Sequence, residues 1–270
     1  MNFIGSKRIR HMKIIKTAFA AAILVLTFVL PGHAQTRLLP QFEIMTEDWS
    51  PYQFTRDGTL VGISVDIVVK LLKAAGSKQG RKDIVMYPWA RGYKTLQKFP
   101  NAVLFLTTKT RERTPLFKWV GPIFSNTTYL IAKKSLSIKI NRPEDIRKFS
   151  IGAVIGDVSV DYLAELGLPK EKLTLTRAAE FGMRMIAIDR IDIVIDNWNN
   201  FLANAKRIGI DPDLYEQVYV VQADEVGIAF NPAIPDWAVS RLQDALDDLR
   251  AKGIVDDLFR KYGLAPEGQR

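Results

Sequence analysis

A short segment with hydroxyl and guanidinium side chains is the part of this sequence best equipped to bind an anion. It covers residues 107–122, TTKTRERTPLFKWVGP, and follows an apolar run at 103–106 that predicts a strand. Arginine presents a planar fork of donors that matches a carboxylate, and the threonine hydroxyls add further donors. Alternatively, Arg111 and Arg113 are solvated charges paired with nearby acids, which is common for arginines in loops. The segment predicts a carboxylate site, and the rest of the chain decides between these two interpretations.

Short β-rich runs alternate with helical patterns along the chain, which predicts an α/β fold with mainly parallel sheets. The predicted strands are residues 42–45, 84–87, 103–106, 129–132, 151–155, 191–195, 218–221 and 226–230. The predicted helices are residues 62–75, 159–166, 178–188 and 197–208, with two more helices within 235–262. Open α/β sheets bind ligands at the carboxyl ends of their strands, so residues that follow strands are candidates for a site.

Two tryptophans occupy such positions. Trp49 follows the first predicted strand and Trp89 follows the second. For a single tryptophan, ordinary core packing is the more common role. Two of them at equivalent strand ends, beside the Thr-Arg segment, predict a slot that holds a ligand between aromatic rings.

The N-terminus has the parts of a secretory signal peptide. A positive region precedes an uncharged apolar run at residues 17–30, and residues 31–34, PGHA, resemble a cleavage site. The apolar run is shorter than the ~20 residues of a membrane-spanning helix, which favours cleavage over an uncleaved anchor. We expect residues 1–34 to be removed, with Met12 as an alternative start. Because the chain contains no cysteine, we expect a soluble periplasmic product without a lipid anchor.

Loss of the signal peptide would change the chemistry available to the chain. The segment contains both histidines, His11 and His33, and five of the 38 basic residues but none of the 29 acidic ones, leaving a formal net charge of about +4. Without His or Cys, a Ser-His-Asp triad, a Cys-His dyad and a typical zinc site are excluded. No basic cluster with interleaved aromatics remains, so nucleic acid is not an expected partner. We therefore expect a binding protein, with no cofactor and no metal, and not an enzyme.

Several motifs follow one another along the chain. They are residues 48–52 (DWSPY), 61–67 (VGISVDI), 110–113 (TRER) with Trp119 and Pro122, then 156–162, 191–196 and 226–230 (VGIAF). Their order resembles that of the periplasmic solute-binding proteins of ABC transporters, family 3, the polar amino-acid-binding type. Each motif alone is weak, but six in this order indicate the family over nearly the whole mature chain. Residues 88–91 (PWAR) and 117–122 (FKWVGP) suggest a divergent branch.

The resemblance implies a type II periplasmic binding protein fold, with two α/β lobes whose two sheets are joined by two hinge strands. Lobe 1 would comprise residues 36–125 and 222–270, and lobe 2 residues 126–221, with crossings near 124–127 and 222–226. Closure of the lobes would exclude water from the ligand and signal occupancy to a partner. The implied function is a monomeric receptor that binds a small polar solute and delivers it to the membrane permease of an ABC importer.

The resemblance also implies roles for individual residues of lobe 1. Arg113 would bind a ligand carboxylate, helped by the Thr108 hydroxyl and backbone. Trp49 and Trp89 would hold the ligand body, and their ring faces would also favour a cationic group. Arg111 is expected to be a surface charge.

On lobe 2, the resemblance assigns Asp196 to the ligand ammonium. Asp196 could also be the N-cap of the helix that begins at Asn197, and the two roles are compatible. Asp192 is expected to be a structural acid without a ligand role.

One turn departs from the family pattern. Residues 156–159, GDVS, open a predicted helix, where a small hydroxyl residue commonly follows the glycine. The amides of the helix N-terminus, here that of Val158, can then receive the ligand carboxylate. Asp157 instead puts a negative charge at this end. It either caps the helix, or it occupies the anion position and shifts the preference toward a cationic or non-carboxylate solute.

Two other functions are compatible with the same fold. A sensory protein would pass ligand occupancy to a membrane kinase or chemoreceptor. A dehydratase-like enzyme would use a carboxylate such as Asp157 or Asp196 as a general acid or base. Nothing in the chain shows paired carboxylates at a defined spacing, so the enzyme is the least favoured of the three.

Overall fold

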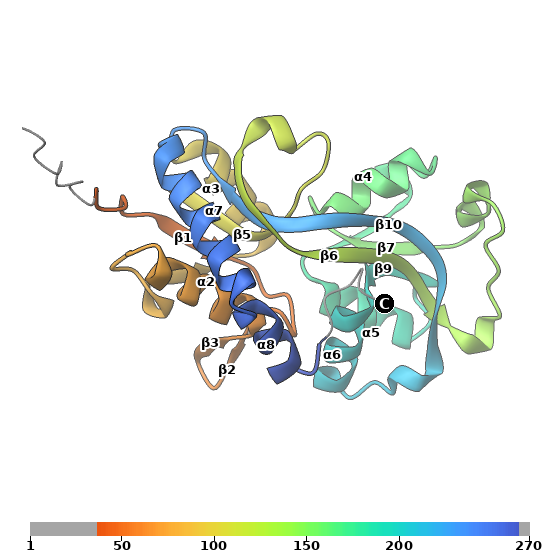
Figure 1. The fold of residues 1–270 in the computed structure, drawn as a ribbon. Coiled ribbons are helices and arrows are strands. Elements are labelled where there is room, and N and C mark those ends of the chain that lie inside the picture. The colour runs from red at the N-terminus through yellow and green to blue at the C-terminus, as the bar shows by residue number, and fades with distance from the viewer. Residues whose placement is uncertain (1–36, 265–270) are drawn as a thin grey trace, which may run out of the picture. The chain divides into compact units, whose positions relative to one another are not determined.

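One eight-stranded sheet is the framework of the protein, with the strand order β4-β1-β5-β10-β6-β9-β7-β8 (Figure 1). The computed structural model describes residues 37–264, so the expected signal peptide at 1–34 lies outside the described residues. The strands are β1 (Glu43–Thr46), β4 (Ile84–Met86), β5 (Ala102–Thr108), β6 (Lys118–Lys133), β7 (Ile151–Val154), β8 (Thr174–Thr176), β9 (Ile193–Asn197) and β10 (Tyr215–Phe230). A separate antiparallel pair is formed by β2 (Phe54–Arg56) and β3 (Thr59–Val61).

The two ends of this sheet are parallel and its centre is antiparallel. On one side β1 pairs in parallel with β4 and β5, and on the other β7 pairs in parallel with β8 and β9. Between them, β10 is antiparallel to β5 and β6, and β6 is antiparallel to β9. The parallel halves put the carboxyl ends of β1, β4 and β5 at one edge, and those of β7, β8 and β9 at another.

Two long strands, β6 and β10, connect the halves of the sheet. Each has 16 residues, and they pair with residues 124–127 opposite residues 223–226. The sequence pattern marks only parts of these strands, at 129–132, 218–221 and 226–230. In the missing part of β6, burial alternates along residues 124–130, but two of the buried positions are the polar Asn126 and Thr128, so the hydrophobic pattern is lost. β6 and β10 occupy the place of the two expected hinge strands.

Helices pack against each half of the sheet (Figure 1). On the first half these are α2 (Ile63–Ala74), α3 (Trp89–Lys98), α7 (Asp236–Ala251) and α8 (Ile254–Lys261). On the second half they are α4 (Val158–Glu165), α5 (Ala179–Ala187) and α6 (Trp198–Ile208). Short 3-10 turns lie at Arg81–Asp83, Thr114–Leu116, Lys134–Leu136, Pro143–Lys148, Lys170–Lys172 and Pro212–Leu214.

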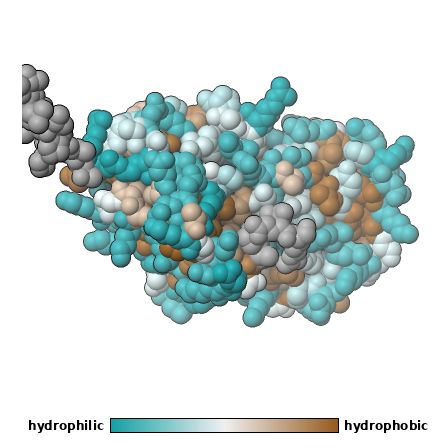
Figure 2. Space-filling view, viewed as in Figure 1, coloured by the Kyte–Doolittle hydropathy of each residue, from teal (hydrophilic) through white to brown (hydrophobic). Residues whose placement is uncertain are grey.

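Each half has its own apolar core. Buried side chains from residues 42–124 and 226–259 form two clusters in the first half, and those from 130–215 form two more in the second. In α7, Leu242, Leu246 and Leu249 recur at helical spacing and are buried, while hydrophilic side chains cover its outer face (Figure 2). Separate cores make the two halves the two lobes of the expected α/β fold, which is thereby confirmed. Instead of two separate sheets, β6 and β10 join both halves into one continuous sheet of eight strands.

The exact lobe boundaries, 36–125 with 222–270 and 126–221, stay a prediction. We refer below to the first half as lobe 1 and to the second as lobe 2. Within the described residues, no helix combines the length and the apolar character that a membrane span requires.

Candidate ligand-binding site

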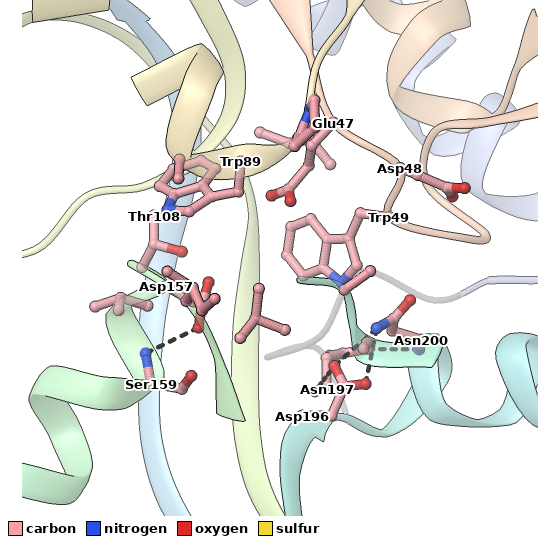
Figure 3. A pocket seen from close by; sticks show the side chains of 18 of the residues that line it. Glu47, Asp48, Trp49, Trp89, Thr108, Asp157, Ser159, Asp196, Asn197 and Asn200 are labelled. Atoms are coloured by element: carbon pink, nitrogen blue, oxygen red, sulfur yellow. Dashed lines mark hydrogen bonds between the residues drawn. The ribbon is translucent and has the colours of Figure 1, made fainter. Parts of the chain in front are cut away.

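A cavity of about 620 Å³ is lined by side chains from both lobes. This volume is within the range of pockets that enclose small organic ligands. All seven residues expected at the site line it: Trp49, Trp89, Thr108, Arg113, Asp157, Val158 and Asp196. Figure 3 shows residues of the strand ends of lobe 1 facing the start of α4 and the end of β9. The structure therefore brings the expected residues together, and their contact with a ligand stays a prediction.

A β-bulge shapes the end of β5 where it enters the cavity. Phe105 pairs with Ile228 and Thr107 with Gly227, so Leu106 is an extra residue in the ladder, and its φ of 55° lies in the left-handed region. Bulges re-aim the side chains that follow them and are frequent beside functional sites. Here Thr108, the last residue of β5, is only 8 % exposed, and Figure 3 shows its hydroxyl at the cavity.

Arg113 is a buried cation with hydrogen-bond donors that no described residue uses. The residue is only 6 % exposed, and its guanidinium carbon lies 5.0 Å from the ring centres of both Trp89 and Tyr93. Nη1 donates to the Thr108 carbonyl oxygen at 3.4 Å. Arg113 forms no ion pair with another described residue, so most of its five N–H donors are available to a ligand.

The two tryptophans border the cavity in different settings (Figure 3). Trp89 begins α3 and stacks on Tyr93, with ring centres 5.5 Å apart. Trp49 packs against Tyr52 at 5.0 Å and Phe124 at 6.4 Å between ring centres. Each indole is thus held by neighbouring aromatic rings, which fixes its position before a ligand binds.

Asp157 caps α4. Its Oδ1 accepts a hydrogen bond from the Ser159 backbone N–H at 2.9 Å, and the helix begins at Val158. The capping interpretation of Asp157 is therefore correct. The same side chain also lines the cavity, so capping does not remove it from the candidate site.

Asp196 does not cap α6, and that part of the expectation is wrong. The N-cap is Asn197, whose Oδ1 accepts from the Asn200 N–H at 3.1 Å, and the helix begins at Trp198. The reason is that β9 extends through Asn197, which moves the cap one residue along the chain.

The Asp196 carboxylate is held by amide donors. Both of its oxygens accept from the Asn200 side chain at 2.8 Å, and Oδ1 also accepts from the Asn197 N–H at 2.7 Å. Burial raises the pKa of Asp196 to about 7, although these hydrogen bonds act in the opposite direction, and the charge of Asp157 raises it further.

Two charged residues lie outside the cavity lining, as expected. Arg111 is exposed. Asp192 accepts hydrogen bonds from the backbone N–H and the hydroxyl of Ser150 at 2.8 and 2.7 Å. Asp192 therefore joins the start of β7 to the start of β9, which is a structural role.

Glu47 is a site residue that the sequence patterns did not identify. It directly follows β1 and lines the cavity. Burial raises the pKa of Glu47 well above its usual value, and the charges of Asp157, Asp48 and Asp196 raise it further, while Arg113 lowers it. Its position at a strand end, two residues before Trp49, is the signal that could have revealed it.

Buried neutral polar groups complete the lining. They are Asn126, Thr128, Ser159, Asn197 and Asn200. The Asn197 side chain donates to the Asn126 Oδ1 at 2.6 Å, which ties the end of β9 to β6. Among residues 37–264, no group of three or more His, Cys, Asp or Glu side chains is placed to hold a metal ion.

Direct hydrogen bonds connect the lobes around the cavity. The Trp89 Nε1 donates to the Gly156 carbonyl oxygen at 2.7 Å, and the Asn199 Nδ2 donates to the Tyr52 Oη at 3.1 Å. On the rim, Arg207 pairs with Asp48 at 3.1 Å. These three contacts join lobe 1 to lobe 2 around the cavity.

The family assignment follows from a comparison with known sequences. The sequence model of the bacterial extracellular solute-binding proteins, family 3, matches residues 43–265. The chain belongs to this family. The match covers both lobes and every residue that lines the cavity, and it confirms the resemblance seen in the sequence motifs. No curated protein matches the chain.

Solved structures agree with the family 3 fold. A histidine kinase sensor domain with similarity to periplasmic binding proteins has a TM-score of 0.73 at 18% identity, covering 82% of this chain and 96% of that one. An ABC uptake transporter substrate-binding protein from Streptococcus pneumoniae has a TM-score of 0.72 at 17% identity, with 84% and 94% covered. The arginine-, lysine- and histidine-binding protein of Geobacillus stearothermophilus has a TM-score of 0.68 at 17% identity, with 84% and 97% covered. At these identities the similarity concerns the fold.

Proposed function

We propose that this chain is a periplasmic receptor that binds a small polar solute, an amino acid or a related compound, between its lobes. It would deliver that solute to the membrane permease of an ABC importer. One observation carries the proposal. In a chain of family 3 of the solute-binding proteins, the cavity is lined by a buried arginine, Arg113, that forms no ion pair with another described residue. Structural relatives include a protein that binds arginine, lysine and histidine and one with bound histidine, which supports an amino-acid-like ligand.

The proposed contacts follow the chemistry of the lining. Arg113 and the Thr108 hydroxyl bind the ligand carboxylate, because both are buried and the hydroxyl has no hydrogen bond to another described residue. Asp196 binds the ligand ammonium. Trp49 and Trp89 pack against the ligand body, and the start of α4, with Asp157 and Val158, closes the opposite side.

The proposal includes export and a monomeric state. Residues 1–34 act as a signal peptide, so the mature protein begins near Gln35 and functions in the periplasm. N-terminal sequencing of the protein recovered from a periplasmic fraction tests this part. A start at Met1 or Met12 of the recovered chain would contradict cleavage.

Ligand binding is tested with a matched pair of arginine variants. A thermal-shift screen of amino acids, polyamines, opines and small organic acids identifies a ligand, because a solute that binds only the folded form raises the melting temperature. Arg113→Ala should then lower the affinity for a carboxylate ligand by about 2–5 kcal/mol in isothermal titration. Arg111→Ala, in the same turn but exposed, is the control and should bind normally. Undiminished affinity of Arg113→Ala would refute the assignment.

Sensing is the second candidate, and the similarity to a histidine kinase sensor domain favours it. A sensory protein would use the same cavity and differ only in its partner. Cells that lack the protein separate the two functions once a ligand is known. Loss of ligand uptake supports the transport receptor, whereas normal uptake with loss of a ligand-induced transcriptional response supports the sensor. In both cases we expect no turnover of the ligand, in keeping with the binding proteins of the family and its relatives.

A further inference from the structure

Two carboxylates from opposite lobes share the cavity. Glu47 enters from the end of β1 in lobe 1, and Asp157 enters from the start of α4 in lobe 2 (Figure 3). Asp157 uses Oδ1 to cap the helix. Glu47 has no hydrogen bond or ion pair with another described residue. Its acceptor oxygens are therefore available to whatever occupies the cavity.

The cavity interior has more negative than positive charge. Glu47, Asp157 and Asp196 line it, and Arg113 is the buried cation that faces them. Asp48 and Arg177 also belong to the lining, but both are exposed to solvent, and Asp48 pairs with Arg207. An unpaired carboxylate removed from water loses its hydration, so it either takes up a proton or is stabilised by a cation or strong donors.

Glu47 is influenced by charged groups of both signs in the cavity. Burial raises the pKa of Glu47, Asp157 is the neighbour whose charge raises it most, and the opposing effect of Arg113 is smaller. Asp157 likewise raises the pKa of Asp196. The cavity therefore favours additional positive charge near Glu47 and Asp157.

A separate observation indicates that a polar ligand belongs in the same space. Arg113 and Thr108 are 6 % and 8 % exposed. The guanidinium has no ion pair, and the Thr108 hydroxyl has no hydrogen bond to another described residue. Buried polar groups are normally satisfied, so these two donors require an acceptor such as a carboxylate.

We propose that Glu47 and Asp157 together form a cation-binding position inside the cavity and determine ligand specificity. The inference rests on the proposed receptor function. The bound solute then carries a guanidinium or ammonium group in addition to the carboxylate at Arg113 and the ammonium at Asp196. Glu47 supplies this position from lobe 1 and Asp157 from lobe 2, so the cationic group bridges the lobes.

The test uses solutes of matched shape and different charge. L-arginine is compared with L-citrulline, in which a neutral urea group replaces the guanidinium, and L-lysine with L-norleucine, which lacks the side-chain ammonium. Isothermal titration should show at least tenfold tighter binding of one cationic solute than of its neutral partner. Glu47→Gln and Asp157→Asn should each reduce that preference at least tenfold, since each removes one charge. Asn at 157 retains an acceptor for the Ser159 N–H and so preserves the cap.

The control variant is Asp192→Asn, which removes a carboxylate that lies outside the cavity lining and is bound to Ser150. It should leave the cationic preference unchanged. Equal or tighter binding of the neutral partners, or a preference that survives both Glu47→Gln and Asp157→Asn, would overturn the inference. If only neutral or acidic amino acids bind, the inference is wrong while the receptor function stands. If no amino acid, polyamine, opine or organic acid binds, the proposed function is wrong as well.

Discussion

Replacing Asp196 by asparagine should make the free energy of unfolding of the ligand-free protein depend less on pH. Burial raises the pKa of Asp196 from 3.8 to about 7, so the folded state holds the proton more tightly than the unfolded state. A carboxyl of this kind lowers the free energy of unfolding as the pH rises between these two values. The stability that wild type loses on going from acidic to neutral pH is therefore partly due to Asp196, and Asp196→Asn removes that part.

The magnitude follows from the size of the pKa shift. Each pH unit between the unfolded and folded pKa values changes the free energy of unfolding by about 1.36 kcal/mol. Between pH 5 and pH 8, of which about two units lie below the folded pKa of about 7, wild type should lose about 2–3 kcal/mol relative to Asp196→Asn. For a protein of this size that corresponds to about 5–10 °C in melting temperature.

The assay compares melting temperatures of the two proteins across this pH range. Both are refolded from denaturant beforehand to remove any ligand that co-purifies. The asparagine side chain places an N–H group against the Asn200 donor, which shifts the stability of the variant by an amount that does not depend on pH. The quantity to examine is therefore how the difference in melting temperature between wild type and Asp196→Asn changes with pH. A difference that is constant from pH 5 to pH 8, or that changes in the opposite direction, would refute the reasoning. Asp192→Asn controls for loss of a negative charge as such.

Two further substitutions test how the cavity is framed. Trp89→Phe keeps an aromatic ring but removes the Nε1 donor to the Gly156 carbonyl, and it should weaken ligand affinity by about 0.5–1.5 kcal/mol, measured by titration. Without ligand, Trp89→Phe should show a larger radius of gyration than wild type in small-angle scattering. An unchanged radius would contradict a role of the Trp89 hydrogen bond in closing the lobes. Gly227→Ala should lower the free energy of unfolding by about 1–3 kcal/mol in urea denaturation, because its Cβ would lie 2.9 Å from the Val120 carbonyl oxygen. Gly80→Ala, where nothing lies within 4 Å of the added Cβ, is the control, and equal effects of the two substitutions would argue against the steric explanation.

The sequence was most informative where periodicity and composition agree. The leucines of α7 recur at helical spacing and are buried, and the apolar strand at 103–106 is the centre of β5. By contrast, β2, β3 and β8 have three residues each and are not uniformly apolar, unlike the equally short β4, whose residues are Ile, Val and Met. The helix α3 was also missed, although Trp89, Tyr93 and Leu96 are spaced as on a helix face. Gly92, a poor helix former, weakened that pattern.

The candidate site was predictable to the extent that each residue stands beside a recognisable local feature. Thr108 ends β5 and Arg113 follows it, and Asp157 stood out because it departs from the pattern of the helix start. Glu47 has only a weak local mark, its place directly after β1, because an acid after a short strand is usually solvated. Its significance comes from a residue about 110 positions away in the chain, and only the fold brings the two carboxylates into one cavity.

This arrangement links ligand charge to lobe closure. Glu47 belongs to lobe 1 and Asp157 to lobe 2, and the charge of Asp157 raises the pKa of Glu47, so on the proposed assignment closure of the lobes would be opposed by repulsion when both carboxyls are ionised. The hydrogen bond from Trp89 to Gly156 acts in the opposite direction and favours closure. A ligand shifts such an equilibrium only by its difference in affinity for the two states. On the proposed assignment, a cationic group between the carboxylates converts their repulsion into two attractions that exist together only in the closed state. A neutral solute of the same shape leaves the repulsion in place, so it would bind more weakly and also close the lobes less completely.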